Sequence, residues 1–264
     1  MTDPQRQALV EQNEALLQKQ LERGELCVPD EANPAHRRLA GLAAEIAAET
    51  GVPARVFILP VEGATEEARR KHQEQTMGRF SAVEPTGVVI IPEAADRYFT
   101  DGEIKAVLSH EFDHLKNPEG LQVRMASQKA YESAAREVHQ ASQAHGVRPE
   151  LLDELKAKQA AALEKLADAS TDFEVSADEQ VIRAGRAADM ASALEKMMVM
   201  RHVGEERAAQ HSPEEVRQYI EAVDAQQRKE NPVVTAQHTK ETFVERLQRL
   251  ERAAKENPQA SRSR

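Results

Sequence analysis

Apolar residues recur every three or four positions in two early segments, residues 4–23 and 35–50, which predicts an amphipathic helix in each. Both segments end at a glycine, which commonly follows the last turn of a helix. The next apolar run, residues 56–59, is short and continuous, as in a buried strand. Two further runs, residues 79–83 and 88–91, flank a turn-forming stretch that contains proline and glycine. They predict a β-hairpin.

From Thr100 onward the apolar pattern has only the helical period. Thr100 and Glu103 form the T-x-x-E pattern of a capping box, which predicts a helix over residues 101–116 that ends at Asn117-Pro118. The other helices are expected at residues 119–144, 149–169, 171–184, 186–202, 213–228 and 239–255. The first two of these predict a long antiparallel hairpin. We therefore expect an α+β fold, mostly α-helical, with a small β-sheet packed on helix 101–116.

Three regions are expected along the chain. Residues 1–34 form an N-terminal helical arm, and residues 35–256 form the main domain, in which the helical hairpin 119–169 is an insert. Residues 257–264 are polar and are expected to be a disordered tail.

The composition narrows the possible partners and locations. The net charge of −10 makes nucleic acid an unfavourable partner. No apolar run is long enough to span a bilayer, and the first twenty residues lack the apolar core of a signal peptide. The single cysteine, Cys27, excludes an internal disulfide and is interpreted as an ordinary loop residue. We expect a soluble, cytoplasmic protein, and the sequence does not indicate its oligomeric state.

The stretch Ser-His-Glu-Phe-Asp-His at residues 109–114 contains an H-E-x-x-H motif within the expected helix. His110 and His114 are four residues apart, so their imidazoles lie on one helical face and can bind one metal ion. Glu111 can reach a water on that ion and take its proton. With nine histidines in the chain, chance could produce the motif, but the helix around it favours a metal site.

A catalytic zinc site takes three protein ligands and keeps one position open. A third histidine in the pattern H-E-x-x-H-x-x-G-x-x-H is excluded, because Asn117 and Gly120 stand where that pattern needs Gly and His. The candidate third ligand is Glu174, and Asp178, one turn later, could orient a ligand histidine. Glu174 has a second interpretation, because Thr171 and Glu174 also form a T-x-x-E box that would cap a helix start.

Two segments together resemble the HtpX-like and CaaX-prenyl-protease family of zinc endopeptidases. Members of that family typically read E-L-x-A-V-L-x-H-E-x-x-H and, later, E-x-x-A-D. Residues 103–114 read EIKAVLSHEFDH and residues 174–178 read EVSAD. The apolar run at residues 87–91 also fits the strand that the family places before its active-site helix. The resemblance covers about residues 35 to 250.

The resemblance implies a gluzincin core that binds Zn²⁺. In it His110, His114 and Glu174 are the ligands and Glu111 is the general base. Membrane-bound relatives have transmembrane helices between the two motifs, whereas this chain has the polar hairpin 119–169, so it resembles the soluble branch.

The family also places a late histidine near the metal, which makes His238 a candidate catalytic residue, although its spacing to Arg246 departs from the family pattern. A solvated histidine at a helix start is the alternative. The oxyanion of the reaction needs a donor besides zinc, and the candidates are His238, Tyr219 and Arg246.

These observations predict a zinc-dependent endopeptidase that acts on a protein or peptide. An extended substrate would pair with the sheet edge formed by residues 79–83. Two alternatives stay open: a non-catalytic protein-binding module on a gluzincin scaffold, with hairpin 119–169 as its binding surface, and a zinc hydrolase of a non-peptide amide.

Overall fold

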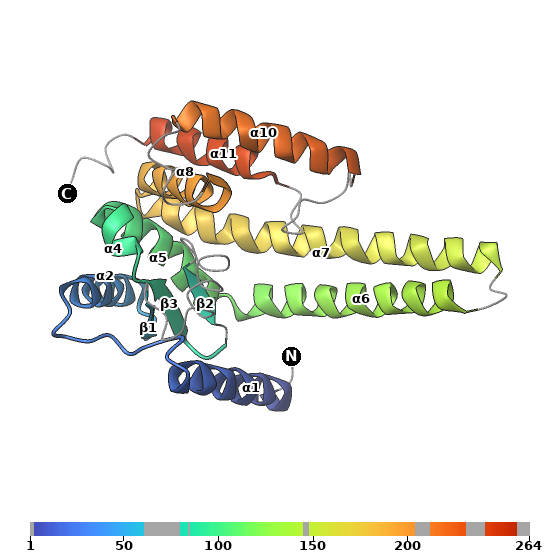
Figure 1. Ribbon diagram of the computed structural model, residues 1–264, viewed down its shortest axis with the longest axis horizontal. Helices are drawn as coiled ribbons and strands as arrows, with labels where there is room; N and C mark the ends of the chain where they lie inside the picture. Colours follow the sequence, from blue (N-terminus) through green and yellow to red (C-terminus); the bar gives the residue numbers. More distant parts are fainter. Residues whose placement is uncertain are drawn as a thin grey trace. The chain divides into compact units, whose positions relative to one another are not determined.

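A computed structural model gives the fold, which is mostly α-helical with one small sheet (Figure 1). The structure describes residues 3–60, 80–83, 85–144, 148–203, 212–230 and 241–257. The α+β class with a dominant helical content is confirmed within these ranges. No helix in the described ranges combines the length and the apolar character that crossing a membrane requires.

The helices and strands have the following bounds. The helices are α1 (Asp3–Glu22), α2 (Pro34–Thr50), α4 (Ala95–Tyr98), α5 (Asp101–Lys116), α6 (Pro118–Gln143), α7 (Pro149–Arg183), α8 (Ala187–Val203), α10 (Pro213–Glu230) and α11 (Phe243–Glu256). The strands are β1 (Arg55–Leu59), β2 (Ser81–Val83) and β3 (Val88–Pro92). The short helix α4 is the one element in this set that the hydrophobic pattern does not predict.

The chain divides into two compact units. Unit 1 consists of Met1–Asn117, Ala177–Arg217 and Leu247–Arg264, and unit 2 consists of Pro118–Ser176 and Gln218–Arg246. The boundary between the units falls inside α7, after Ser176, so one continuous helix carries residues of both.

The sheet of unit 1 has the strand order β1-β3-β2. β1 pairs with β3 in parallel, and β2 pairs with β3 as an antiparallel hairpin, as predicted. Gly87, with a φ of 69°, lies in the turn between β2 and β3, where a left-handed backbone is needed that glycine adopts without strain. β2 is therefore a strand at one edge of the sheet.

Helix α5 lies at the centre of unit 1 and packs against α2, α8 and β2. Its first residues are held by the predicted capping box: the Glu103 amide donates to Thr100 Oγ1 at 3.3 Å, and the Thr100 amide donates to Glu103 Oε2 at 2.7 Å. Its bounds, 101–116, agree with the prediction. The fully buried members of its apolar face are Ile104, Ala106, Leu108 and Phe112. The burial of these four side chains anchors the helix that carries both histidines.

Two predicted helix boundaries are wrong. No break occurs between residues 169 and 171, because Thr171 Oγ1 donates to the Ala167 carbonyl at 2.7 Å inside the continuous helix α7. A hydroxyl that bonds back to position i−4 supports a helix interior and not a helix start. The last helix begins at Phe243 rather than residue 239, since Thr242 and Glu245 form its capping box.

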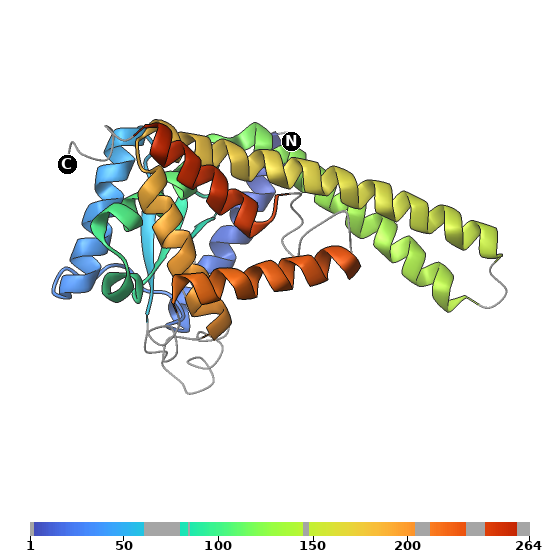
Figure 2. The ribbon, with the colours of Figure 1, turned by 90° about the horizontal axis from the view of Figure 1, so that it is seen from above.

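In unit 2, the helices α6 and α7 form the predicted antiparallel hairpin. They lie side by side in both views (Figures 1 and 2). Lys158 Nζ on α7 lies 2.7 Å from Glu137 Oε2 on α6, and the Arg124 guanidinium stacks 5.4 Å from the centre of the Phe173 ring. These two contacts lie toward opposite ends of the hairpin and link its two helices.

Candidate metal centre

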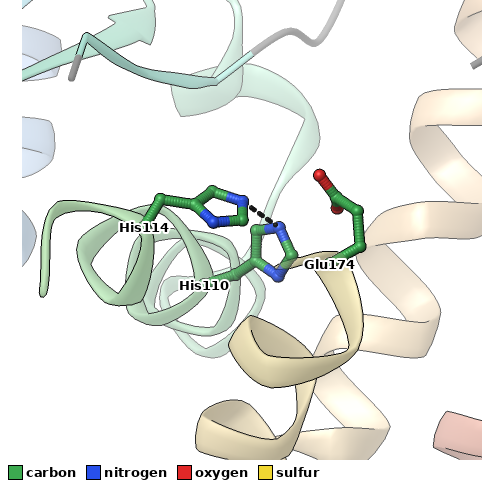
Figure 3. Close-up of side chains that lie close together, drawn as sticks. All are labelled: His110, His114 and Glu174. Atoms are coloured by element: carbon green, nitrogen blue, oxygen red, sulfur yellow. Dashed lines mark hydrogen bonds between the residues drawn. The ribbon is translucent and has the colours of Figure 1, made fainter. Parts of the chain in front are cut away.

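His110 and His114 project from the same side of α5, as their spacing predicts (Figure 3). The two Nε2 atoms are 3.0 Å apart, and the exposed fractions of the two residues are only 4% and 7%. Helical geometry places residues i and i+4 one above the other, which explains the pairing of the rings. The Nε2 atoms of the two buried imidazoles face each other. This arrangement suits two ligands of one shared cation better than two histidines that act independently.

Asp178 lies on the opposite side of the His110 ring. Its Oδ1 atom is 2.9 Å from His110 Nδ1, and the residue is completely buried. Arg249 on α11 donates from Nη2 to the other oxygen, Oδ2, at 2.8 Å. A carboxylate in this place favours the imidazole tautomer with the proton on Nδ1, which leaves the lone pair of Nε2 available for a metal.

Glu174 stands one helical turn before Asp178 on α7. His110, His114 and Glu174 each offer a ligand atom, and these atoms all lie within 4.8 Å of one another. Figure 3 shows the Glu174 side chain on α7 beside the two rings. The interpretation of Glu174 as a helix cap is wrong, because residues 171–174 are in the interior of α7. Arg246 Nη1 lies 3.2 Å from Glu174 Oε2 and balances its charge.

The chemistry of this group fits a zinc ion. Zinc takes imidazole nitrogen and carboxylate oxygen at about 2.0–2.2 Å, and two nitrogens on a tetrahedral ion lie about 3.3 Å apart. The separation of 3.0 Å between the two Nε2 atoms is close to that value. The group could therefore hold a metal ion, with two neutral ligands and one anionic ligand.

Glu111 points to the sheet. Its Oε2 atom accepts a hydrogen bond of 2.7 Å from the backbone amide of Ala82 on β2. Glu111 is half-buried and follows His110 directly in the chain. The carboxylate that the sequence predicts as general base is thus held by the edge strand.

A buried arginine ties this part of α5 to its neighbours. Arg186 is 3% exposed, and its Nη1 donates to Ser109 Oγ at 2.9 Å. Its Nη2 pairs with Glu49 Oε2 of α2 at 2.5 Å. Ser109 precedes His110, so Arg186 links this turn of α5 to α2. A buried charge needs such partners, because desolvation without them is costly.

The structure describes the positions of two of the three candidate oxyanion donors. Arg246 lies beside Glu174, and Tyr219 is on α10 with an exposed fraction of 52%. His238 lies outside the described residues, so its role stays a prediction. Sequence reasoning did not identify Arg249 or the Ala82 amide, and no local motif marks either of them.

Cys27 lies at the other edge of the sheet, where it forms a β-bridge with Ile58 of β1. Burial, with smaller contributions from Glu93 and Asp30, raises the pKa of its thiol. A metal takes the thiolate, and a raised pKa disfavours that form. Cys27 has the character of a structural residue.

Searches of protein-family models, of curated proteins and of solved structures found no match to this chain. The motifs and the geometry of the site are therefore the basis for assigning its function.

Proposed function

We propose that this protein is a zinc-dependent endopeptidase with a gluzincin-like core. The observation that carries the proposal is the grouping of His110, His114 and Glu174, each with a ligand atom within 4.8 Å of the others. Glu111 directly follows His110 in the chain. The resemblance of residues 103–114 and 174–178 to the HtpX-like family supports the same assignment.

The residues of the site would have different roles in the reaction. His110, His114 and Glu174 would bind the ion, and Asp178 would orient the His110 ring. When bound, zinc supplies Lewis-acid activation of a water and of the scissile carbonyl. Glu111 takes a proton from the attacking water and delivers it to the leaving amine.

The position of the site next to a sheet edge suits an extended peptide. β2 is the edge strand, and its residue Ala82 contacts Glu111. A peptide beside an edge strand can form main-chain hydrogen bonds with it, here with the Ala82 carbonyl as an acceptor because the Ala82 amide donates to Glu111. Such a peptide presents its backbone carbonyls at regular spacing. We therefore favour a peptide bond over a non-peptide amide as the bond that is hydrolysed.

The test separates chemistry from metal binding. Protein with one equivalent of zinc should cleave a denatured protein substrate, and chelation should abolish the cleavage. Glu111→Gln should keep its zinc and lose activity by a factor of about 10² to 10⁴, because it removes the proton acceptor and not a ligand. Glu119→Gln, at an exposed position of α6, is the matched control.

Cleavage by Glu111→Gln at the wild-type rate, with equal zinc content, would remove Glu111 as the base. Zinc binding without hydrolysis of any protein substrate would instead favour the protein-binding module.

A further inference from the structure

The backbone of Ala82 has an orientation that the strand register defines. In the antiparallel pair, Ser81 lies opposite Ile90, Ala82 opposite Val89 and Val83 opposite Val88. Along such a strand, consecutive residues turn their N–H and C=O groups alternately to the partner strand and away from it. Since the Ala82 amide donates to Glu111, Ala82 is the residue that faces away from β3.

This outward amide meets a carboxylate that faces it from α5. The Ala82 N to Glu111 Oε2 distance of 2.7 Å is short for an N–H···O bond, as expected when the acceptor is charged. Ala82 takes part in this contact only through its backbone N–H, and not through its side chain. A methyl group at position 82 leaves the strand backbone close to α5, which packs directly on β2.

We propose that the Ala82 backbone amide is a positioning group for the catalytic carboxylate of Glu111, an inference that rests on the proposed function. The amide holds Oε2 at the sheet edge and thereby sets the rotation of the carboxylate, so that Oε1 is the oxygen directed to the attacking water. The register with β3 fixes the amide itself, because the hairpin cannot slide without losing its pairing.

A main-chain donor is well suited to hold the Glu111 carboxylate. A backbone N–H in a paired strand has almost no freedom to move, whereas a side-chain donor would need further contacts to hold it. A base that is held within a few tenths of an ångström contributes to rate through orientation. Loss of the amide should therefore lower kcat and leave KM nearly unchanged.

The first experiment needs no catalysis. The Ala82 amide proton resonance is followed by NMR in the wild type and in Glu111→Ala, both without metal. Loss of a charged acceptor should move this resonance upfield, and by more than the resonances of Ser81 and Val83. A shift no larger than those of its two neighbours overturns the contact.

The second experiment measures the positioning role. Ala82→Pro removes the N–H and keeps the hydrogen bonds to β3, since this amide faces away from that strand, and proline is tolerated on edge strands. In the zinc-loaded protein, kcat should fall about tenfold or more, the scale of one lost hydrogen bond to a charged group. KM and zinc content should stay within about twofold. Ala82→Ser, which keeps the amide, is the matched reference, and the fall in kcat of Ala82→Pro is measured relative to it.

A double-mutant cycle identifies coupling to Glu111. In the Glu111→Gln background, Ala82→Pro should have no further effect on the residual rate beyond about twofold. An equal fold-loss in both backgrounds overturns the proposal, because a general distortion of the site would act in both. If Ala82→Pro does not fold, lactate at position 82 replaces the amide by an ester and gives the same comparison.

The two proposals fail in different ways. Wild-type protein that cleaves no peptide overturns the proposed function, and the positioning role with it, even where the NMR shift is present. Active wild-type protein whose Ala82 resonance ignores Glu111→Ala overturns only the positioning role.

Discussion

The Nδ1 atom of His110 lies 2.9 Å from Oδ1 of Asp178, and the Asp178 side chain has no exposed surface. The two residues come from different helices, α5 and α7, and the second carboxylate oxygen is occupied by Arg249. The carboxylate therefore has a fixed position, and it fixes the orientation of the His110 ring in turn.

Asp178→Asn should weaken zinc binding about 10- to 100-fold, the usual effect of losing a carboxylate that orients a ligand histidine. The amide lacks the charge that favours the Nδ1 proton. Competition with a chromophoric chelator measures the dissociation constant. Asp172→Asn, at an exposed position of the same helix, should leave it unchanged. Equal affinities for both variants would mean that Asp178 only stabilises the fold.

Glu174→Gln should weaken zinc binding more than Asp178→Asn does, because the carboxylate of Glu174 would bind the ion directly. A neutral amide oxygen is a poor replacement for an anionic ligand. The same chelator competition decides the order. Glu179→Gln, which changes an exposed carboxyl on α7, provides the control. The reverse order would make Asp178 the ligand.

The buried carboxyl of Glu103 should make stability depend on acid. Burial alone raises its pKa, but hydrogen bonds from Lys196, Ser192 and the Thr100 amide, with the Lys196 charge, lower the pKa below the ordinary value of 4.5. A lowered folded-state pKa contributes stability above the unfolded-state value, and this contribution is lost as the pH falls through the folded-state pKa.

Glu103→Gln should therefore destabilise the protein most above about pH 5, and the difference from the wild type should shrink below the ordinary glutamate pKa. Urea unfolding at a series of pH values measures it. Glu119→Gln, an exposed carboxyl, should show no such trend. A difference that is independent of pH would mean that the Glu103 charge has no part in stability.

Phe112 lies between His110 and His114 in the sequence and is fully buried. Phe112→Ala should lower the free energy of unfolding by about 3–5 kcal/mol, because it removes a large side chain and leaves a cavity. Urea unfolding of the metal-free protein measures the loss. Val123→Ala on α6, where the side chain is 58% exposed, should change it by about 0.5 kcal/mol or less. A loss below about 1 kcal/mol for Phe112→Ala would show that α5 is not anchored by this residue.

Helix α5 shows how much local sequence specifies. Its start depends on Thr100 and Glu103, three residues apart, and its end on Asn117-Pro118. The shared face of His110 and His114 follows from their spacing in any helix. All these effects act within about one helical turn, so they can be read from neighbouring residues without knowledge of the fold.

Thr171 shows where the same rule misleads. Thr171 begins the same T-x-x-E pattern as Thr100. The helix α7 nevertheless continues past it, and the Thr171 hydroxyl donates to the Ala167 carbonyl. The buried residues Leu166, Ala167 and Phe173 lie on both sides of Thr171 and keep the helix continuous. Packing against the rest of the chain outweighed a local preference of about 1 kcal/mol. Thr242 and Glu245 form the same pattern and do cap a helix, although the sequence-based prediction placed that helix start at residue 239.

The sequence by itself determined the helical class, the hairpin of β2 and β3, and the pairing of two histidines on one helical face. Only the tertiary structure decided that Glu111 meets the Ala82 amide, 29 residues away, and that Arg249 meets Asp178 across 71 residues. The physical reason is that helical hydrogen bonds, the hydrophobic period and helix capping all depend on residues that are close together in the chain. Contacts between distant residues depend instead on how whole apolar faces pack, and many arrangements of those faces satisfy the same local pattern.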